Sequence, residues 1–155
     1  MSETMVSTDP VVATLPENLR PNLIRLLNGW RDDMPEIDPI FLEDTKSQLV
    51  AVSVGGKVVG GYLLAPIPMA FEMIGLAIAP EHRRQGLGRM CCMDALFRAG
   101  KRPLVLTAND ASAPFAKQVG FKIVGKRKAA DGSTLTRFGW HAPRPTGDPN
   151  NPLAC

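Results

Sequence analysis

Two glycines between two β-rich runs limit the possible folds of this chain more than any other feature. Residues 47–54 read SQLVAVSV, residues 57–64 read KVVGGYLL, and Gly55 and Gly56 separate them. Paired glycines adopt the positive backbone angles of a two-residue hairpin turn without strain. The sequence therefore predicts an antiparallel hairpin, which rules out a sheet that is parallel throughout.

Strand and helix patterns alternate along the rest of the chain. Gly100 and Gly120 follow two helical patterns as expected C-terminal stops, and Asp131 and Gly132 mark a final hairpin. The predicted segments are strands at 10–14, 70–79 and 103–108, helices at 16–30, 88–100 and 112–120, a short helix within the acidic connection 31–46, and hairpin strands at 121–129 and 133–141. This β-α-α-β-β-β-α-β-α-β-β order predicts an α/β fold, a mixed central sheet of about six to seven strands flanked by about four helices.

The bulk composition predicts one soluble domain over residues 1–142 and a Pro/Asn-rich tail over 143–155. A net charge of +3 without a long basic run gives no reason to expect nucleic acid. The apolar runs are interrupted by Gly and Pro and are too short for a membrane span. The N-terminus lacks an export pattern and the three cysteines lack metal-ligand spacing, so we expect a cytoplasmic protein without metal.

The stretch HRRQGLGRM at residues 82–90 carries the clearest chemical signal. It lies between a predicted strand and a predicted helix, where the first helical N–H groups have no internal partner and favour an anion. Glycines at 86 and 88 permit close approach, and Arg83, Arg84 and Arg89 add positive charge. The segment fits neither a dinucleotide-binding turn nor a Walker A loop. By itself it is equally typical of a glycine-rich connection with solvated arginines.

Two motifs in register resemble the GNAT acetyltransferase superfamily. Arg83 to Gly88 match its acyl-CoA motif [QR]-x-x-G-x-[GA], and Asn109 to Phe121 resemble its N-x-x-A-x-x-L-Y-x-K-x-G-F segment. The resemblance covers about residues 47–140. It implies an N-acetyltransferase that uses acetyl-CoA as co-substrate. The cofactor-binding residues that it implies are Ala77, Ile78, Arg83, Arg84, Gln85, Gly86, Leu87, Gly88, Arg89, Asn109, Ser112 and Phe115.

The resemblance also implies roles for these groups. Main-chain groups of Ala77 and Ile78 would pair with pantetheine, and the N–H groups from Arg84 to Arg89 would hold the pyrophosphate. The N–H of Ile78 would stabilise the oxyanion. Glu72 would be the general base, as a glutamate is at this offset in the histone acetyltransferase branch. The alternative is a strand-edge Glu that faces water, which has the same sequence pattern.

The chain differs from the family at the residue that would protonate the leaving thiolate. Ala116 stands where the family commonly has a tyrosine acid, and the single tyrosine of the chain is Tyr62. Three alternatives follow for this proton transfer. Water protonates the thiolate, another side chain such as Tyr62 or Ser112 replaces the tyrosine, or catalysis is weak. We favour water, because a thiol with a pKa of about 8.5 leaves readily. Cys91 and Cys92 are expected to be inert core thiols.

The acceptor is expected to be a primary amine, either a small molecule or a peptide. Acidic side chains gather in the predicted connection, and they would attract a cationic amine. These residues are Asp32, Asp33, Glu36, Asp38, Glu43 and Asp44. A homodimer is one expected assembly. Two other functions remain open: an acyl-CoA-binding sensor or interaction module with weak turnover, and a nucleotide-binding protein of another class.

Overall fold

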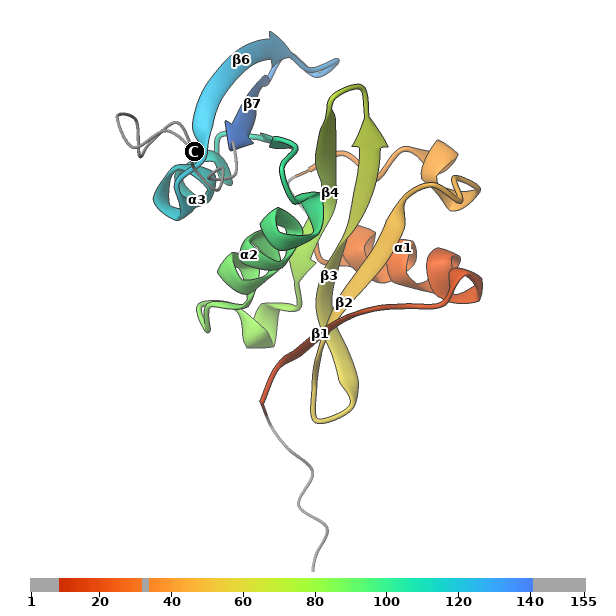
Figure 1. Cartoon of the computed structure of the whole chain (residues 1–155). Coiled ribbons are helices and arrows are strands. Elements are labelled where there is room, and N and C mark those ends of the chain that lie inside the picture. The colour runs from red at the N-terminus through yellow and green to blue at the C-terminus, as the bar shows by residue number, and fades with distance from the viewer. Residues whose placement is uncertain (1–8, 32–33, 141–155) are drawn as a thin grey trace, which may run out of the picture. The chain divides into compact units, whose positions relative to one another are not determined.

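The computed structural model describes residues 9–31 and 34–140, and these residues form a mixed sheet with helices (Figure 1). The strands are β1 (Val11–Thr14), β2 (Gln48–Val54), β3 (Lys57–Ile67), β4 (Ala70–Ile78), β5 (Leu104–Ala108), β6 (Lys122–Lys128) and β7 (Thr134–Trp140). The helices are α1 (Arg20–Gly29), α2 (Leu87–Ala99) and α3 (Ala113–Val119), with short 3-10 turns η1 (Glu17–Leu19), η2 (Pro39–Leu42) and η3 (Pro80–His82). Three predictions fall outside the described residues: the tail at 143–155, the last residue of the final strand, His141, and two of the acidic residues, Asp32 and Asp33.

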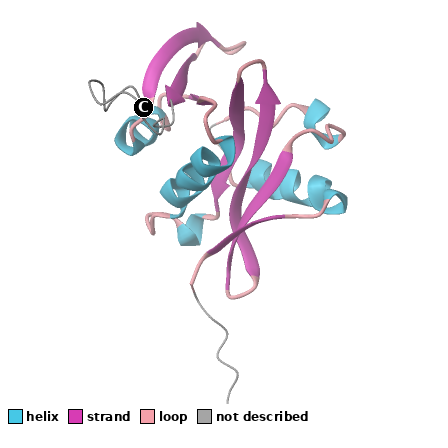
Figure 2. Ribbon diagram, viewed as in Figure 1, coloured by secondary structure: helices cyan, strands magenta, loops and turns pink. Residues whose placement is uncertain are grey.

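The seven strands are hydrogen-bonded in the order β1-β2-β3-β4-β5-β7-β6. β4 and β5 are parallel, whereas β1 with β2, β2 with β3, β5 with β7 and β6 with β7 are antiparallel. Figure 2 shows these strands in magenta. The mixed α/β sheet expected from the sequence is therefore confirmed. None of the described helices is both long and apolar enough to cross a membrane.

The glycine signals place the turns and helix ends correctly. Gly55 and Gly56 have φ values of 59° and 82° and join β2 to β3. Gly100 and Gly120, with φ values of 66° and 124°, directly follow α2 and α3. A residue without Cβ adopts these angles at little cost, so each local signal was sufficient.

The helix count is lower than predicted: the described residues contain three α-helices rather than about four. In its described residues the acidic connection holds the 3-10 turn η2 and no α-helix; Pro39 begins this turn, and the Asp38 carboxylate caps it by accepting a 3.0 Å bond from the Ile40 N–H. At the N-terminal helix, Pro21 delays the start. Pro16 precedes η1, while Pro21 lies in the first turn of α1.

The chain divides into two compact units. The first unit contains the described residues up to Leu64 together with Ile74–Cys91. Its core lies between α1 and strands β2 to β4, and Figure 1 shows α1 in orange-red beside them. This core consists of Leu23, Ile24, Leu27, Ile37, Leu49, Ala51, Leu63 and Ala77.

The second unit contains Ala65–Met73 and the described residues from Cys92 onward. Phe121 and Trp140 pack edge to face with ring centroids 5.4 Å apart. An ideal Cβ at Gly120 would lie 2.8 Å from the Trp140 ring, so this glycine serves both the helix end and the ring packing. The Arg102 guanidinium lies 5.5 Å from the centroid of Phe71.

Candidate active site

The loop before α2 presents six consecutive backbone N–H groups, those of residues 84–89. The Arg83 N–H donates to the Pro80 carbonyl at 3.3 Å, and the Met90 N–H donates to the Gly86 carbonyl at 3.0 Å. Between these two residues, no amide donates to an acceptor in the part of the chain that the structure describes. N–H groups ahead of a helix carry partial positive charge and suit a phosphate group.

The backbone of this loop turns through two left-handed residues. Arg84 has φ 64° and Gly86 has φ 79°. The left-handed conformation costs a residue with a side chain roughly 1–2 kcal/mol, and such strain gathers at functional sites. Successive N–H groups in alternating right- and left-handed conformations form a concave anion-binding nest. The loop geometry is therefore suited to an anion without any side-chain contribution.

Gly86 is not required by packing inside the protein, because an ideal Cβ there meets no heavy atom within 4 Å. Leu87, in contrast, is only 2 % exposed and anchors the start of α2. Arg84, Gln85 and Arg89 are exposed around the loop. Within the loop, Leu87 therefore packs into the protein, whereas the side chains of Arg84, Gln85 and Arg89 face solvent.

The Arg83 side chain bonds to two backbone carbonyls. Its Nε donates to the Ile78 carbonyl at 2.9 Å, and its Nη2 donates to the Trp30 carbonyl at 2.6 Å. Both bonds are made within the first unit. The guanidinium therefore has two acceptors inside the protein, and it differs in this from the side chains of Arg84 and Arg89.

The backbone N–H and C=O groups of residues 77–79, at the end of β4, point alternately toward β3 and away from it. The Ala79 N–H donates to the Val59 carbonyl at 2.7 Å, and the Ala77 carbonyl approaches Gly60. In an antiparallel pair, the N–H and C=O of one residue point to the same side, and those of the next residue point to the opposite side. The N–H and C=O of Ile78 therefore point away from β3.

Gly60 allows β3 and β4 to approach closely at this place. An ideal Cβ at Gly60 would lie 2.5 Å from the Ile78 Cδ1 and 2.9 Å from the Ala77 oxygen. Gly75 has φ 74°, the left-handed value expected from a strand irregularity, and a Cβ there would overlap Ile37. The position of Ile78 thus depends on two glycines in neighbouring strands.

In the second unit, Asn109 and Ser112 bond to each other. The Asn109 Oδ1 accepts from the Ser112 N–H and from the Ser112 hydroxyl, each at 2.9 Å. The Ser112 Oγ accepts from the Asn109 N–H at 3.1 Å. Ser112 occupies the N-cap position of α3 but makes no side-chain cap bond. Phe115 is half-buried on the first turn of α3.

Glu72 forms an ion pair that sequence reasoning missed. Its Oε2 accepts from the Arg137 Nη1 at 3.1 Å, and this nitrogen also lies 3.2 Å from the Thr107 Oγ1. The Glu72 side chain is 24 % exposed. No local signal pointed to this pair, because the alignment of β4, β5 and β7 brings together residues 65 positions apart. The contact gives Glu72 a structural role whether or not it also acts on a substrate.

Tyr62 and the two cysteines expected as core thiols are buried, whereas Ser112, the other possible proton donor, is half-buried. Tyr62 is 0 % exposed in β3, opposite Val50, which favours a core role over contact with a thiolate. Ala116 is 1 % exposed, so α3 offers no hydroxyl at the position where the family has tyrosine. Cys91 and Cys92 are both 0 % exposed, as the apolar helix pattern predicted.

Two of the acidic residues in the connection have structural roles. Asp38 caps η2, and the Asp44 carboxylate accepts from the Lys46 N–H at 2.9 Å. Glu36 and Glu43 are exposed. Asp38 is exposed as well, so the described part of the connection presents three exposed acidic side chains to a cationic molecule.

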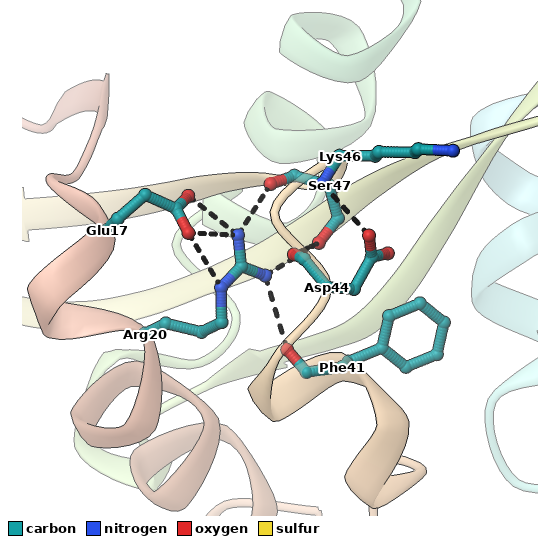
Figure 3. Close-up of polar contacts among 6 residues, drawn as sticks. All are labelled: Glu17, Arg20, Phe41, Asp44, Lys46 and Ser47. Atoms are coloured by element: carbon teal, nitrogen blue, oxygen red, sulfur yellow. Dashed lines mark hydrogen bonds and ion pairs between the residues drawn. The ribbon is translucent and has the colours of Figure 1, made fainter.

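Arg20 holds this connection against α1, as Figure 3 shows. The guanidinium donates to the Glu17 carboxylate, the Phe41 carbonyl, and both the hydroxyl and the carbonyl of Ser47. Its five N–H groups are thereby satisfied, which permits an exposed fraction of only 2 %.

Comparison with solved structures supports the fold. The alanine N-acetyltransferase of ribosomal protein S18 from Escherichia coli superposes with a TM-score of 0.71 and 16 % identity, over 86 % of this chain and 94 % of that chain. An IAA acetyltransferase from Bacillus cereus gives 0.67 and 18 %, over 86 % and 100 %. A GNAT family acetyltransferase from Elizabethkingia anophelis with acetyl-CoA bound gives 0.66 and 18 %, over 86 % and 98 %. Among curated proteins, no sequence matches the chain.

The profile of the Acetyltransferase (GNAT) family matches residues 16–121, which is more than half of the chain. The match includes the loop at 84–89, the end of β4 and the Asn109–Ser112 pair. The chain therefore belongs to the GNAT family and is an N-acetyltransferase that uses acetyl-CoA.

Proposed function

We propose that the protein transfers the acetyl group of acetyl-CoA to a cationic primary amine by direct attack within a ternary complex. One observation carries the donor half of this proposal: within the described chain the six N–H groups of residues 84–89 have no protein acceptor, and they come one short turn, η3, after Ile78. The loop would hold the pyrophosphate. The Ala77 and Ile78 main chain would bind pantetheine, with Asn109 and Phe115 as further contacts to it.

The chemistry at the thioester requires a neutral amine and a stabilised oxyanion. An amine with a pKa of about 10.4 is almost fully protonated at neutral pH, so a base must remove one proton. We assign this role to Glu72, whose carboxylate is partly exposed and accepts a hydrogen bond from Arg137. The amine nitrogen then attacks the carbonyl carbon, and the Ile78 N–H stabilises the oxyanion. The carbon–sulfur bond breaks with its electron pair on sulfur, and the attacking nitrogen gives its surplus proton to solvent water. Water protonates the coenzyme A thiolate.

A cationic acceptor fits the exposed carboxylates of Glu36 and Glu43, which would raise its local concentration. A panel of cationic, neutral and anionic amines, assayed by thiol release from acetyl-CoA, tests this assignment. Faster turnover of cationic amines is expected. Acetylation confined to anionic amino acids would contradict it.

A pair of glycine variants tests the pyrophosphate loop. Gly86→Ala and Gly132→Ala place the same methyl group at left-handed residues, with φ 79° and 87°, and neither Cβ meets a protein atom within 4 Å. Both are expected to lower stability by about 1 kcal/mol. Only Gly86→Ala should weaken coenzyme A binding, by about tenfold or more in calorimetry, because its methyl group obstructs a phosphate. Equal affinities of the two variants would exclude this loop.

Glu72→Gln separates a base from a structural residue. If Glu72 is the base, kcat falls by 10²-fold or more, typical of general base catalysis, while coenzyme A affinity stays within about twofold. Arg137→Gln is the matched control, because it breaks the same ion pair and leaves the carboxylate. Similar losses in both variants would assign Glu72 to structure alone. If wild-type protein binds coenzyme A but acetylates no amine in the panel, the binding-module alternative, suggested by Ala116, takes precedence.

A further inference from the structure

Arg83 forms a planar fork between two backbone carbonyls. Nε and Nη2 lie on the same edge of the guanidinium, and they donate to Ile78 at 2.9 Å and to Trp30 at 2.6 Å. Two donors in fixed geometry hold two acceptors in fixed relation, which the single flexible ammonium of lysine does not do. Arg83 therefore joins the end of β4 to a residue 53 positions earlier in the chain.

The Trp30 carbonyl is a natural acceptor for this arginine. Trp30 is the C-cap of α1, and its own N–H bonds back to carbonyls in the last turn of that helix. Carbonyls at a helix C-terminus lack intrahelical partners and carry partial negative charge. α1 itself is fixed by the buried core of the first unit, so it offers Arg83 a rigid support.

The other bond restrains the peptide group that links Ile78 to Ala79. Its carbonyl accepts from Arg83, and its N–H donates to the Val59 carbonyl at 2.7 Å. A peptide group bonded at both ends has little freedom to rotate. The torsion on the carbonyl side of Ile78 is thereby restricted, and with it the direction of the Ile78 N–H, which points away from β3.

We propose that Arg83 is a positioning residue for acetyl transfer, acting through the Ile78 backbone and not through the pyrophosphate. This inference rests on the proposed function, in which the Ile78 N–H stabilises the oxyanion. It predicts a separation within one motif: Arg84 and Arg89 act on cofactor affinity, whereas Arg83 acts on the rate of the chemical step.

The test measures kcat by thiol release and the Kd of coenzyme A by calorimetry in Arg83→Met and Arg83→Lys. Misplacing a catalytic group by about 1 Å costs on the order of 10²-fold in rate. We expect kcat to fall by about 10- to 100-fold in Arg83→Met, with the Kd within about twofold of wild type. Arg83→Lys should recover only a small part of the rate, because one ammonium does not bridge both carbonyls in a fixed plane.

Three comparisons make the result decisive. Arg25→Met removes an exposed charge on α1 and should match wild type. Arg84→Met and Arg89→Met should weaken coenzyme A binding. In Arg83→Ala, added guanidinium ion at millimolar concentration should restore part of the lost kcat, which loss of folding alone does not permit. A raised Kd at unchanged kcat in Arg83→Met would overturn the inference, as would loss of kcat without rescue. If wild type itself fails to bind coenzyme A, the proposed function fails instead.

Discussion

Gly60→Ala offers the sharpest test of how β3 positions the end of β4. The new Cβ would lie 2.9 Å from the Ala77 oxygen, about 0.5 Å inside the shortest ordinary contact of 3.4 Å. It would also lie 2.5 Å from the Ile78 Cδ1, but this side-chain atom can rotate away. The backbone oxygen cannot, so the β4 backbone must move by a few tenths of an ångström at the residue before Ile78.

This displacement sets the expected magnitudes. Overpacking of this kind costs about 1–3 kcal/mol, and we expect the lower half of this range because the misfit is small. If a 1 Å misplacement costs about 10²-fold in rate, half that distance costs about tenfold. Gly60→Ala should therefore lose about 1–2 kcal/mol of unfolding free energy and about tenfold in kcat.

Urea unfolding and steady-state thiol release measure the two quantities on the same preparation. Gly125→Ala is the matched control, because Gly125 also lies in a strand and its Cβ would meet no atom within 4 Å. A Gly60→Ala variant that is destabilised as expected but keeps kcat within twofold would refute the link between strand spacing and transfer. An equal loss of kcat in Gly125→Ala would refute it as well.

Three further predictions concern stability. The Ser133 hydroxyl and N–H hold the pKa of Asp131 below its ordinary value of 3.8. The ionised carboxylate therefore stabilises the fold above pH 3.8, and this contribution is lost as the pH falls through the lowered folded-state pKa. Ser133→Ala should raise the Asp131 pKa toward 3.8 in an NMR titration, and an unchanged titration would contradict the assignment. Arg20→Met leaves buried acceptors without donors and should cost about 3 kcal/mol in urea unfolding; a loss below 1 kcal/mol would show that water replaces the guanidinium. Gly75→Ala combines a left-handed φ with overlap against Ile37 and should cost about 2–4 kcal/mol, and a neutral result would mean that the strand irregularity is not required.

Local signals predicted the elements, because each one depends on a few neighbouring residues. Gly55 and Gly56 determine a turn by their own backbone angles, and Gly100 ends a helix for the same reason. The connection at 31–46 was less predictable. Its prolines and the Asp38 cap favour a short 3-10 turn, but the periodicity of an acidic loop does not distinguish this turn from a short α-helix.

The partners of charged side chains were not predictable in this way. Arg83 was expected to face an anion because its sequence neighbours are glycines and arginines, yet its acceptors are carbonyls at the ends of β4 and α1. Arg137 meets Glu72 only because three strands align. Gly60 is explained by a carbonyl in β4, and nothing in its own sequence context indicates that contact.

A difference between backbone and side-chain chemistry explains why the sequence indicates donors for the cofactor more clearly than it indicates the groups that transfer protons. Backbone N–H groups exist at every non-proline residue, so a motif that fixes the path of the chain also fixes the donors at 84–89. Proton transfer depends on one particular side chain, and here Tyr62 is buried while Ala116 has no hydroxyl. A thiolate whose conjugate acid has a pKa of about 8.5 is a good leaving group without an acid. Loss of the tyrosine is therefore compatible with transfer, provided that Ile78 and the loop keep their geometry, which is the property that the Arg83 and Gly60 variants perturb.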